Sequence, residues 1–187
     1  LAVLWLGLFL SREPDLGRLE TFSQVIRSEE GSIINLRLTP SGHWRERASL
    51  NNIDAKLVEM LVAYEDKRFM SHLGVDPIAL LRATYNSITS RRVVSGASTL
   101  TMQTVRLMHP ELQQRSLLSK LKQMLEAVRL ERHLTKEEIL EAYFALAPYG
   151  GNIEGVEAAS EAWFQKRPNV LTMSEAALLV ALPQSPE

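Results

Sequence analysis

The sequence contains no cysteine, and it carries no large excess of charge of either sign. The absence of cysteine excludes disulfide frameworks, cysteine-ligated zinc, iron–sulfur clusters and thiol nucleophiles. Its 21 Lys and Arg against 22 Asp and Glu give a formal net charge of -1, which disfavours both a strongly basic duplex binder and an acidic disordered chain. With 187 residues, 45% of them hydrophobic, the chain can bury the core of one domain and carry a small appendage.

No hydrophobic run in the sequence is long enough to cross a bilayer by itself. Residues 1–10 read LAVLWLGLFL, about half of the roughly 20 apolar residues that a spanning helix needs. We interpret this run as the C-terminal stub of a transmembrane anchor. A signal-peptide core and a buried helix are the alternatives, but no small-x-small cleavage site follows the run.

The near-zero net charge hides an uneven distribution along the chain. Between positions 82 and 123, Glu111 is the only acid, and seven residues are basic: Arg82, Arg91, Arg92, Arg106, Arg115, Lys120 and Lys122. Positions 137–161 hold six acids and no Lys or Arg. The middle of the chain is therefore a candidate anion site, although charge alone also fits a solvated surface whose charges balance in space.

The pattern changes from strand-like to helical near residue 42. Val25-Ile26 and Ile33-Ile34 flank Ser28-Glu29-Glu30-Gly31, which predicts a β-hairpin. Helices are expected over residues 54–69 and 115–133, after the cap Asp76-Pro77, from Ser98-Thr99, and at capping boxes formed by Thr135 with Glu138 and Thr172 with Glu175. We therefore expect a mainly α domain over residues 49–187, and before it a linker and hairpin over residues 11–48 near the membrane.

Glu65 is the most informative candidate for catalysis. It follows Leu57 and Leu61 at spacings of eight and four residues, so it should project from the core-facing side of its helix. A carboxylate in that environment is desolvated, which suits it to handling protons near neutral pH. A salt-bridged structural glutamate is the alternative. Asp66 faces another way, as a cap or hydrogen-bond partner, and His72 lies in the next loop without a second histidine at metal-ligand spacing.

Residues 96–103 place exposed amide groups and two hydroxyls at a helix start, which suits an anion or sugar oxygens. The stretch is neither a Walker loop nor a nucleophile elbow. Arg106 follows Gln103 on the same helix, and Arg115 and Lys120 come later. Clustered cations beside a buried acid would suit a diphosphate leaving group, whereas ordinary solvated helix faces are the alternative.

These segments, in this order, resemble the glycosyltransferase domain of bifunctional penicillin-binding proteins, glycosyltransferase family 51. Residues 65–74 (EDKRFMSHLG) match its motif Glu-Asp-x-x-Phe-x-x-His-x-Gly, and residues 96–103 (GASTLTMQ) match Gly-x-Ser-Thr-Ile/Leu-Thr-x-Gln. Residues 136–143 (KEEILEAY) match Lys-x-x-Ile-Leu-Glu-x-Tyr. The resemblance covers about residues 50–187, and residues 147–152 and 182–184 look most like the penicillin-binding protein 1C branch.

Two departures from the family pattern are visible. The third motif of the family reads Arg-Lys-x-x-Glu, and the equivalent positions here are Ser119, Lys120 and Gln123, so the second active-site acid is absent. Gln is usual at this place in the 1C branch, and a neutral amide can hydrogen-bond a phosphate or sugar although it cannot titrate. Ala145 stands where the fourth motif continues with Asn.

The resemblance implies a lysozyme-like α fold and the polymerisation of lipid II into glycan strands, with release of undecaprenyl diphosphate. The domain would lie on the outer side of the bacterial cytoplasmic membrane, and Glu65 would be the general base that deprotonates the acceptor sugar. The residues implied in substrate binding are Asp66, Phe69, His72, Gly96, Ser98, Thr99, Gln103, Arg106, Arg115, Lys120 and Gln123. A divalent cation (Mg or Mn) at the diphosphate and partners among other cell-wall synthesis proteins stay open, and no nucleic-acid partner is implied.

Two other functions stay open from the residues. A lysozyme-like enzyme would use Glu65 as a general acid to cleave glycan, although a cleaved glycan presents no diphosphate to the basic residues. An inactive membrane-anchored scaffold of the cell wall is the second alternative, suggested by Gln123.

Overall fold

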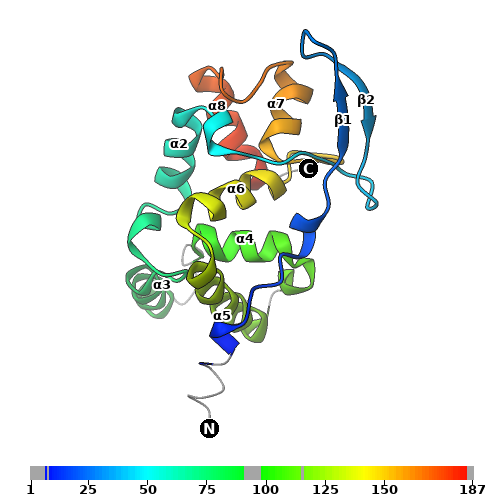
Figure 1. Cartoon of the computed structure of the whole chain (residues 1–187). Helices are drawn as coiled ribbons and strands as arrows, with labels where there is room; N and C mark the ends of the chain where they lie inside the picture. The colour runs from blue at the N-terminus through cyan, green and yellow to red at the C-terminus, as the bar shows by residue number, and fades with distance from the viewer. Residues whose placement is uncertain (1–6, 8, 91–97, 115, 185–187) are drawn as a thin grey trace.

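The computed structural model describes residues 7, 9–90, 98–114 and 116–184 of the chain. Figure 1 shows a mainly helical domain with helix α4 near its middle and a two-stranded hairpin on one side. The helices of the described residues are α2 (Ala55–Glu65), α3 (Pro77–Ser90), α4 (Leu100–Met108), α5 (Leu117–His133), α6 (Lys136–Leu146), α7 (Val156–Phe164) and α8 (Met173–Ala181). Between them lie the short 3₁₀ turns η1 (Gly17–Glu20), η2 (Leu50–Asn52), η3 (Phe69–Ser71), η4 (Pro110–Gln113) and η5 (Leu182–Gln184). The mainly α fold expected from the sequence is confirmed.

Helix α4 lies at the centre of the hydrophobic core. Its apolar side chains Leu100, Met102, Val105 and Met108 are all buried, and α5 and α6 pack against it. Each such side chain stabilises the fold by about 1.5–3 kcal/mol when it is fully removed from water. Helix α2 packs against α8 and contributes to the same core. Helices α2 and α4, which carry the candidate residues, are therefore anchored in one hydrophobic core.

Helix α2 ends at Glu65, four residues before the end that the apolar pattern predicts. Asp66 leaves the helical region, with φ -156° and ψ 75°. Its side chain accepts a hydrogen bond at 3.0 Å from the N–H of Leu100, the first residue of α4. The chain then turns back through η3, where Phe69 is completely buried. An acid that caps the neighbouring helix therefore ends α2 earlier than the periodicity alone indicates.

The expected helix starts at Asp76 and Thr99 are confirmed. Asp76 Oδ1 accepts hydrogen bonds from the N–H groups of Ile78 and Ala79 at 2.9 and 3.0 Å. Thr99 Oγ1 accepts one from the Met102 N–H at 3.1 Å. These bonds satisfy amide groups that have no partner within the first turn of a helix.

Both predicted capping boxes are also present, at the starts of α6 and α8. In the second, Glu175 accepts a hydrogen bond from the Thr172 N–H at 2.7 Å and lies 2.7 Å from the Lys166 ammonium. Hydrogen bonds from Lys166 and Thr172 lower the pKa of Glu175 from 4.5 to about 2.

We expect Glu175→Gln to make the stability of the protein less sensitive to acid. Because the pKa of Glu175 is depressed by folding, its carboxylate contributes stability that is complete above the unfolded pKa near 4.5 and is lost as the pH falls toward 2. Denaturant unfolding at about pH 6 and about pH 3 measures this contribution. The loss of stability between the two pH values should be smaller in the variant, and an equal loss in both proteins would contradict the assignment.

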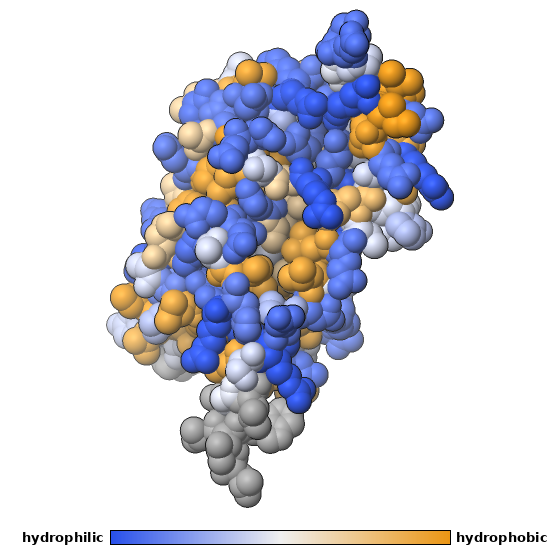
Figure 2. Space-filling model, viewed as in Figure 1, coloured by the Kyte–Doolittle hydropathy of each residue, from blue (hydrophilic) through white to orange (hydrophobic). Residues whose placement is uncertain are grey.

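The predicted β-hairpin is present. Strand β1 (Gln24–Arg27) pairs antiparallel with β2 (Ile33–Arg37), and Ile26 and Ile34 remain exposed. Figure 2 shows apolar side chains at its upper right, where Figure 1 places the hairpin. The hairpin lies at the opposite end of the molecule from the described residues nearest the N-terminus (Figure 1). Its expected place near the membrane stays a prediction.

A second strand pairing crosses the boundary expected at residues 48 and 49. Strand β3 (Trp44–Arg45) runs parallel to β4 (Ile153–Glu154). The Arg45 guanidinium is buried, with Nη2 2.5 Å from Glu154 Oε2, and Arg18 pairs with the other oxygen of Glu154. The segment before residue 49 is therefore joined to the helical domain by a buried ion pair as well as by the chain itself.

Within the described residues, no helix is both long and apolar enough to cross a membrane. Of the predicted anchor stub at residues 1–10, only residues 7, 9 and 10 are described. The stub and the division of the chain at residues 10 and 48 stay predictions.

Candidate active site

The Glu65 carboxylate is held between two glutamine side chains. Gln103 of α4 donates from Nε2 to Oε2 at 2.8 Å, and Gln184 of η5 donates from Nε2 to Oε1 at 2.5 Å. The side chain is half-buried rather than turned into the core, because α2 ends at this residue. An amide donates without titrating, so both carboxylate oxygens are oriented while the group keeps its capacity to accept a proton.

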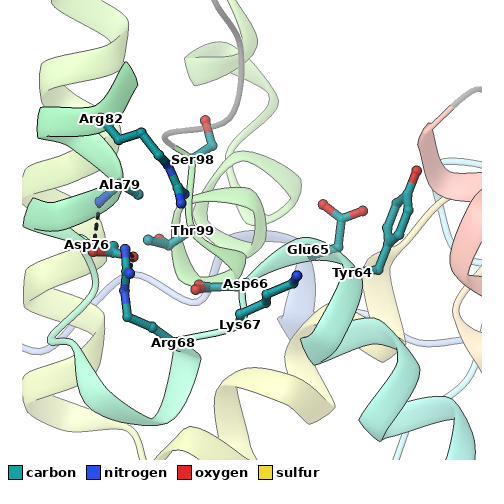
Figure 3. Close-up of a pocket in the computed structure, with 10 residues that line it drawn as sticks. All are labelled: Tyr64, Glu65, Asp66, Lys67, Arg68, Asp76, Ala79, Arg82, Ser98 and Thr99. Carbon is teal, nitrogen blue, oxygen red and sulfur yellow. Dashed lines mark hydrogen bonds and ion pairs between the residues drawn. The ribbon is translucent and has the colours of Figure 1, made fainter. Parts of the chain in front are cut away.

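A cavity of about 310 Å³, which we call the Glu65 cavity, opens beside this carboxylate (Figure 3). It is lined by Tyr64, Glu65, Asp66, Lys67, Arg68, Asp76, Ala79, Arg82, Ser98 and Thr99. In Figure 3, Arg82 of α3 extends toward Ser98 and Thr99, and Lys67 extends toward the side of the cavity that holds Glu65. Three basic side chains and three hydroxyls in one cavity, beside its carboxylates, suit an anion or the oxygens of a sugar.

One of these cations, Arg68, is already paired with a carboxylate of the protein. Arg68 Nη2 and Nε lie 2.6 and 2.9 Å from Asp76 Oδ2. Burial works against the charge of this carboxylate, but hydrogen bonds from the Ala79 N–H and from Arg68 hold the pKa of Asp76 below its usual value. The pair fixes the start of α3 against the loop that follows Glu65, so it shapes the floor of the cavity.

A second cavity of about 300 Å³, which we call the Arg106 cavity, is lined in part by Gln103, whose side chain donates to Glu65 of the first cavity. It is lined by Gln103, Arg106, Leu107, Gln113, Tyr143, Pro148 and Pro183. Burial, and then the negative charge of Glu65, raise the pKa of Tyr143 above its ordinary value of 10.0, while Arg106 acts in the opposite direction. The Tyr143 phenol therefore stays a neutral hydroxyl that can both donate and accept hydrogen bonds.

Lys120 of α5 contacts a residue of the Glu65 cavity and lies close enough to Arg106 for the charges to interact. Its Nζ donates to Ser98 Oγ, which belongs to the Glu65 cavity. Burial, and then the charge of Arg106, lower the pKa of Lys120. An anion bound at these two cations would relieve both their repulsion and the desolvation of the ammonium. The arrangement is therefore suited to a phosphate or diphosphate.

A buried polar network lies behind the site and joins the loop after α2 to α5 and α6. His72 Nε2 lies 2.9 Å from Asp66 Oδ2, and Lys136 donates to the His72 carbonyl at 2.8 Å. Glu131 accepts hydrogen bonds from Lys136 Nζ at 2.7 Å and from Thr101 Oγ1 at 2.5 Å. The Asp66, His72 and Glu131 side chains are at most 5% exposed. The network therefore holds the loop next to Glu65 without facing the solvent.

Five predicted substrate-binding residues line the two cavities. Asp66, Ser98 and Thr99 line the Glu65 cavity, and Gln103 and Arg106 line the Arg106 cavity. Asp66 and Thr99 are also occupied as helix caps. Ser98, Gln103 and Arg106 are therefore the residues of this group best placed for a ligand.

Three other predicted binding residues lie in the interior. Phe69, His72 and Gln123 are buried and line neither cavity. Gln123 Nε2 donates to the Leu112 carbonyl at 2.6 Å, which ties α5 to η4. A carboxylate could not donate this bond and would be left beside the carbonyl unpaired, so the departure from the third motif has a structural reason. Contact between these three residues and a substrate stays a prediction, and Gly96 and Arg115 lie outside the described residues.

Sequence reasoning missed Gln184, Tyr143 and Lys67 as residues of the site. Gln184 is 119 positions from Glu65, and no spacing rule connects residues so far apart. Lys67 and Tyr143 lie within the first and fourth motifs. Assigning a role to every polar residue of each motif would have found these two.

The described residues contain no group of three or more His, Asp or Glu that could hold a metal ion. Both Glu65 oxygens accept hydrogen bonds from amides, and Asp66 Oδ2 is occupied by His72 and by the Leu100 N–H. The described side chains therefore do not form a cation site by themselves.

The fold and the site define a helical domain in which the half-buried Glu65 carboxylate lies near several cations, and comparison with known proteins identifies its class. Residues 31–187 match the family model for transglycosylases. The chain belongs to this transglycosylase family, and the domain that it forms is a peptidoglycan glycosyltransferase of cell-wall synthesis.

The chain is similar to several penicillin-binding proteins. It is 40% identical over 164 residues to penicillin-binding protein 1C of Escherichia coli (strain K12), a match that covers 88% of this chain and 21% of the relative. It is 35% identical over 190 residues to penicillin-binding protein 1A of the same organism, covering 96% and 22%. It is 37% identical over 145 residues to penicillin-binding protein 1F of Bacillus subtilis (strain 168), covering 76% and 20%. The family resemblance is confirmed, and the chain spans about a fifth of the length of these curated relatives.

Proposed function

We propose that this domain joins lipid II units into glycan strands and releases undecaprenyl diphosphate on the outer side of the bacterial cytoplasmic membrane. The observation that carries the proposal is the Glu65 carboxylate, which two amides orient in a cavity that also holds basic side chains, with Arg106 in the neighbouring cavity that Gln103 lines. Membership of the transglycosylase family supports the reaction class.

Glu65 acts in this proposal as the general base toward the acceptor sugar. It takes the proton of the acceptor 4-hydroxyl, and the hydroxyl oxygen attacks the anomeric carbon of the lipid-linked donor. The new glycosidic bond forms as the bond from the anomeric carbon to the diphosphate breaks, with inversion. The electron pair of the broken bond leaves with undecaprenyl diphosphate, and the proton remains on Glu65. A positioned base of this kind contributes about 10²–10⁴-fold to the rate.

Lys120 and Arg106 stabilise the charge of the leaving group. The two cations are close enough for the charge of Arg106 to lower the pKa of Lys120, so a diphosphate between them gains two charge-assisted contacts. Because negative charge on the leaving oxygen grows as the donor bond breaks, these contacts strengthen in the transition state. Ser98, already bonded to Lys120, is placed to hold the donor.

The site supports the two alternative functions less well. A glycan-cleaving enzyme would use Glu65 as general acid on a substrate without a diphosphate, which leaves Lys120 and Arg106 without a role. An inactive scaffold was suggested by the missing second acid, but Gln123 is buried away from both cavities, and the base and the cations are in place.

Exposed apolar side chains support association with a membrane. Leu117, Leu118 and Leu121 are exposed at the start of α5, as are Ile78 and Leu81 on α3. In Figure 1 these two helices lie at the end of the molecule that holds the described residues nearest the N-terminus, and Figure 2 shows apolar side chains over α3 on the visible face. An apolar surface beside the predicted anchor would bring the cavities close to a lipid-linked substrate.

The test is to incubate the purified protein with lipid II in one reaction and with finished glycan strands in another. Polymer from lipid II, with undecaprenyl diphosphate released, supports the proposal. Digestion of finished glycan without polymer formation would favour the hydrolase, and binding of lipid II with neither reaction would favour the scaffold.

We expect Lys120→Met to lower kcat for polymerisation about 100-fold, the usual effect of removing one preorganised group that stabilises transition-state charge. Lys122→Met is the matched control, because Lys122 is exposed on the same helix, whereas Lys120 donates to Ser98 of the Glu65 cavity. Initial rates of lipid II consumption compare the two. Equal effects of both substitutions would show that the charge of α5 acts only in a general way and would remove Lys120 from the site.

A further inference from the structure

We propose that Gln184 is a positioning residue for the Glu65 carboxylate in the transfer reaction, an inference that rests on the proposed function. Gln184, in η5, donates to Glu65 Oε1 at 2.5 Å, and Gln103 donates to the other oxygen, Oε2. The base is therefore held from two elements that are distant in the sequence, and each of its oxygens has one amide donor.

The path of the chain explains how Gln184 reaches this place. Helix α8 packs along α2, and η5 continues α8 directly as Leu182–Gln184. Leu182 packs against the core, and Pro183 lines the Arg106 cavity. Leu182 and Pro183 thus hold the backbone just before Gln184, and the Gln184 side chain points to Glu65 at the end of α2.

The position of Glu65 at the end of a helix explains why the Gln184 donor matters. Glu65 is the last residue of α2, where unpaired carbonyl groups and the helix dipole disfavour a negative charge. Gln103 and Gln184 each place an N–H donor against one oxygen of this carboxylate. Because an amide does not titrate, this support does not compete for the proton that Glu65 must take from the acceptor.

Two other roles for Gln184 make different predictions. A residue that only completed the fold would change stability and leave the pH dependence of catalysis unaltered. Since the Gln184 side chain is exposed, it could also contact the sugar directly, and its loss would then raise KM. Positioning predicts a lower kcat with an unchanged KM, together with a shifted pH–rate profile.

Two substitutions test the positioning role in the whole chain. Gln184→Met keeps the length of the side chain and removes the donor, so kcat should fall about tenfold while KM stays within about twofold of wild type. Gln184→Glu places a second carboxylate within hydrogen-bond distance of Glu65, and two such groups share one proton at low pH. The acid limb of the pH–rate profile should therefore move upward by about one pH unit or more. Gln24→Glu, the same change at an exposed position of β1, should leave both kcat and the profile as in wild type.

A measurement that needs no activity separates this inference from the proposed function. Carboxyl carbon-13 NMR of the protein without substrate follows the titration of Glu65 in wild type and in Gln184→Glu. A midpoint that moves to higher pH in the variant supports the positioning role, even if the wild-type protein makes no polymer and the proposed function fails. An unmoved midpoint, or a raised KM with an unmoved acid limb, would overturn it.

Discussion

Glu65→Gln is expected to lower kcat for lipid II polymerisation about 1,000-fold, the largest effect that we predict for a single substitution on activity. The glutamine side chain has the same size and can still meet Gln103 and Gln184 as hydrogen-bond partners. It cannot take up the proton of the acceptor hydroxyl. The thermal unfolding midpoint should therefore stay close to that of wild type, while the initial rate of polymer formation falls about 1,000-fold.

Glu59→Gln is the matched control for this substitution. Glu59 is on the same helix, is exposed and lines neither the Glu65 cavity nor the Arg106 cavity. The polymerisation rate of the Glu59→Gln protein should therefore remain within about twofold of wild type. A Glu65→Gln protein that keeps more than about a tenth of the wild-type kcat would show that another group is the base.

Glu131→Ala is expected to have the largest effect on stability, lowering the free energy of unfolding by about 3–5 kcal/mol. The substitution removes the partner of a Lys136 ammonium whose side chain is only 16% exposed and lies 2.6 Å from the carboxylate. It also takes away the acceptor for the Thr101 hydroxyl. The Lys136 charge then loses its carboxylate partner and keeps neutral contacts such as that with the His72 carbonyl. Denaturant unfolding with a fixed m-value measures the loss.

Glu126→Ala on the same helix is the matched control for stability. Glu126 pairs with Arg129 one turn away, and its side chain is 26% exposed, so its removal should cost no more than about 1 kcal/mol. Replacing both Glu131 and Lys136 by leucine should recover a large part of the loss, because no unpaired charge is then left in the interior. Equal destabilisation by Glu131→Ala and Glu126→Ala would contradict the role assigned to the network.

The local signals in the sequence predicted the fold well where the physics is local. Asp76, Thr99, Thr135 and Thr172 cap helices where the sequence indicates, because a cap needs only residues within one turn of it. The hairpin around Gly31 is local in the same sense. Fold class and most helix starts therefore follow from the sequence without reference to distant contacts.

The end of α2 could not be predicted in this way, because it depends on a contact across the core. Asp66 leaves the helix to bind the Leu100 N–H, 34 positions along the chain. Because the helix ends there, Glu65 lines the Glu65 cavity instead of facing the core as expected. Apolar periodicity describes which face of a helix is buried, but it contains no information about where a neighbouring helix needs a cap.

The identity of the catalytic candidate was predictable, but its environment was not. The motifs resembling the family pointed to Glu65 and to Gln103. The second amide, from Gln184, and the tie from Gln123 to the Leu112 carbonyl depend on how α8 and η4 pack. Side-chain partners of this kind become visible only after the tertiary structure is known.

The most direct test of the central claim is to count undecaprenyl diphosphate released and glycosidic bonds formed in one reaction of purified protein with lipid II. If Glu65 is the base of a transfer reaction, wild type should release one diphosphate for each bond formed, and Glu65→Gln should show neither product above background in the same time. Diphosphate release without new glycosidic bonds in wild type, or polymer formation by Glu65→Gln at the wild-type rate, would contradict it.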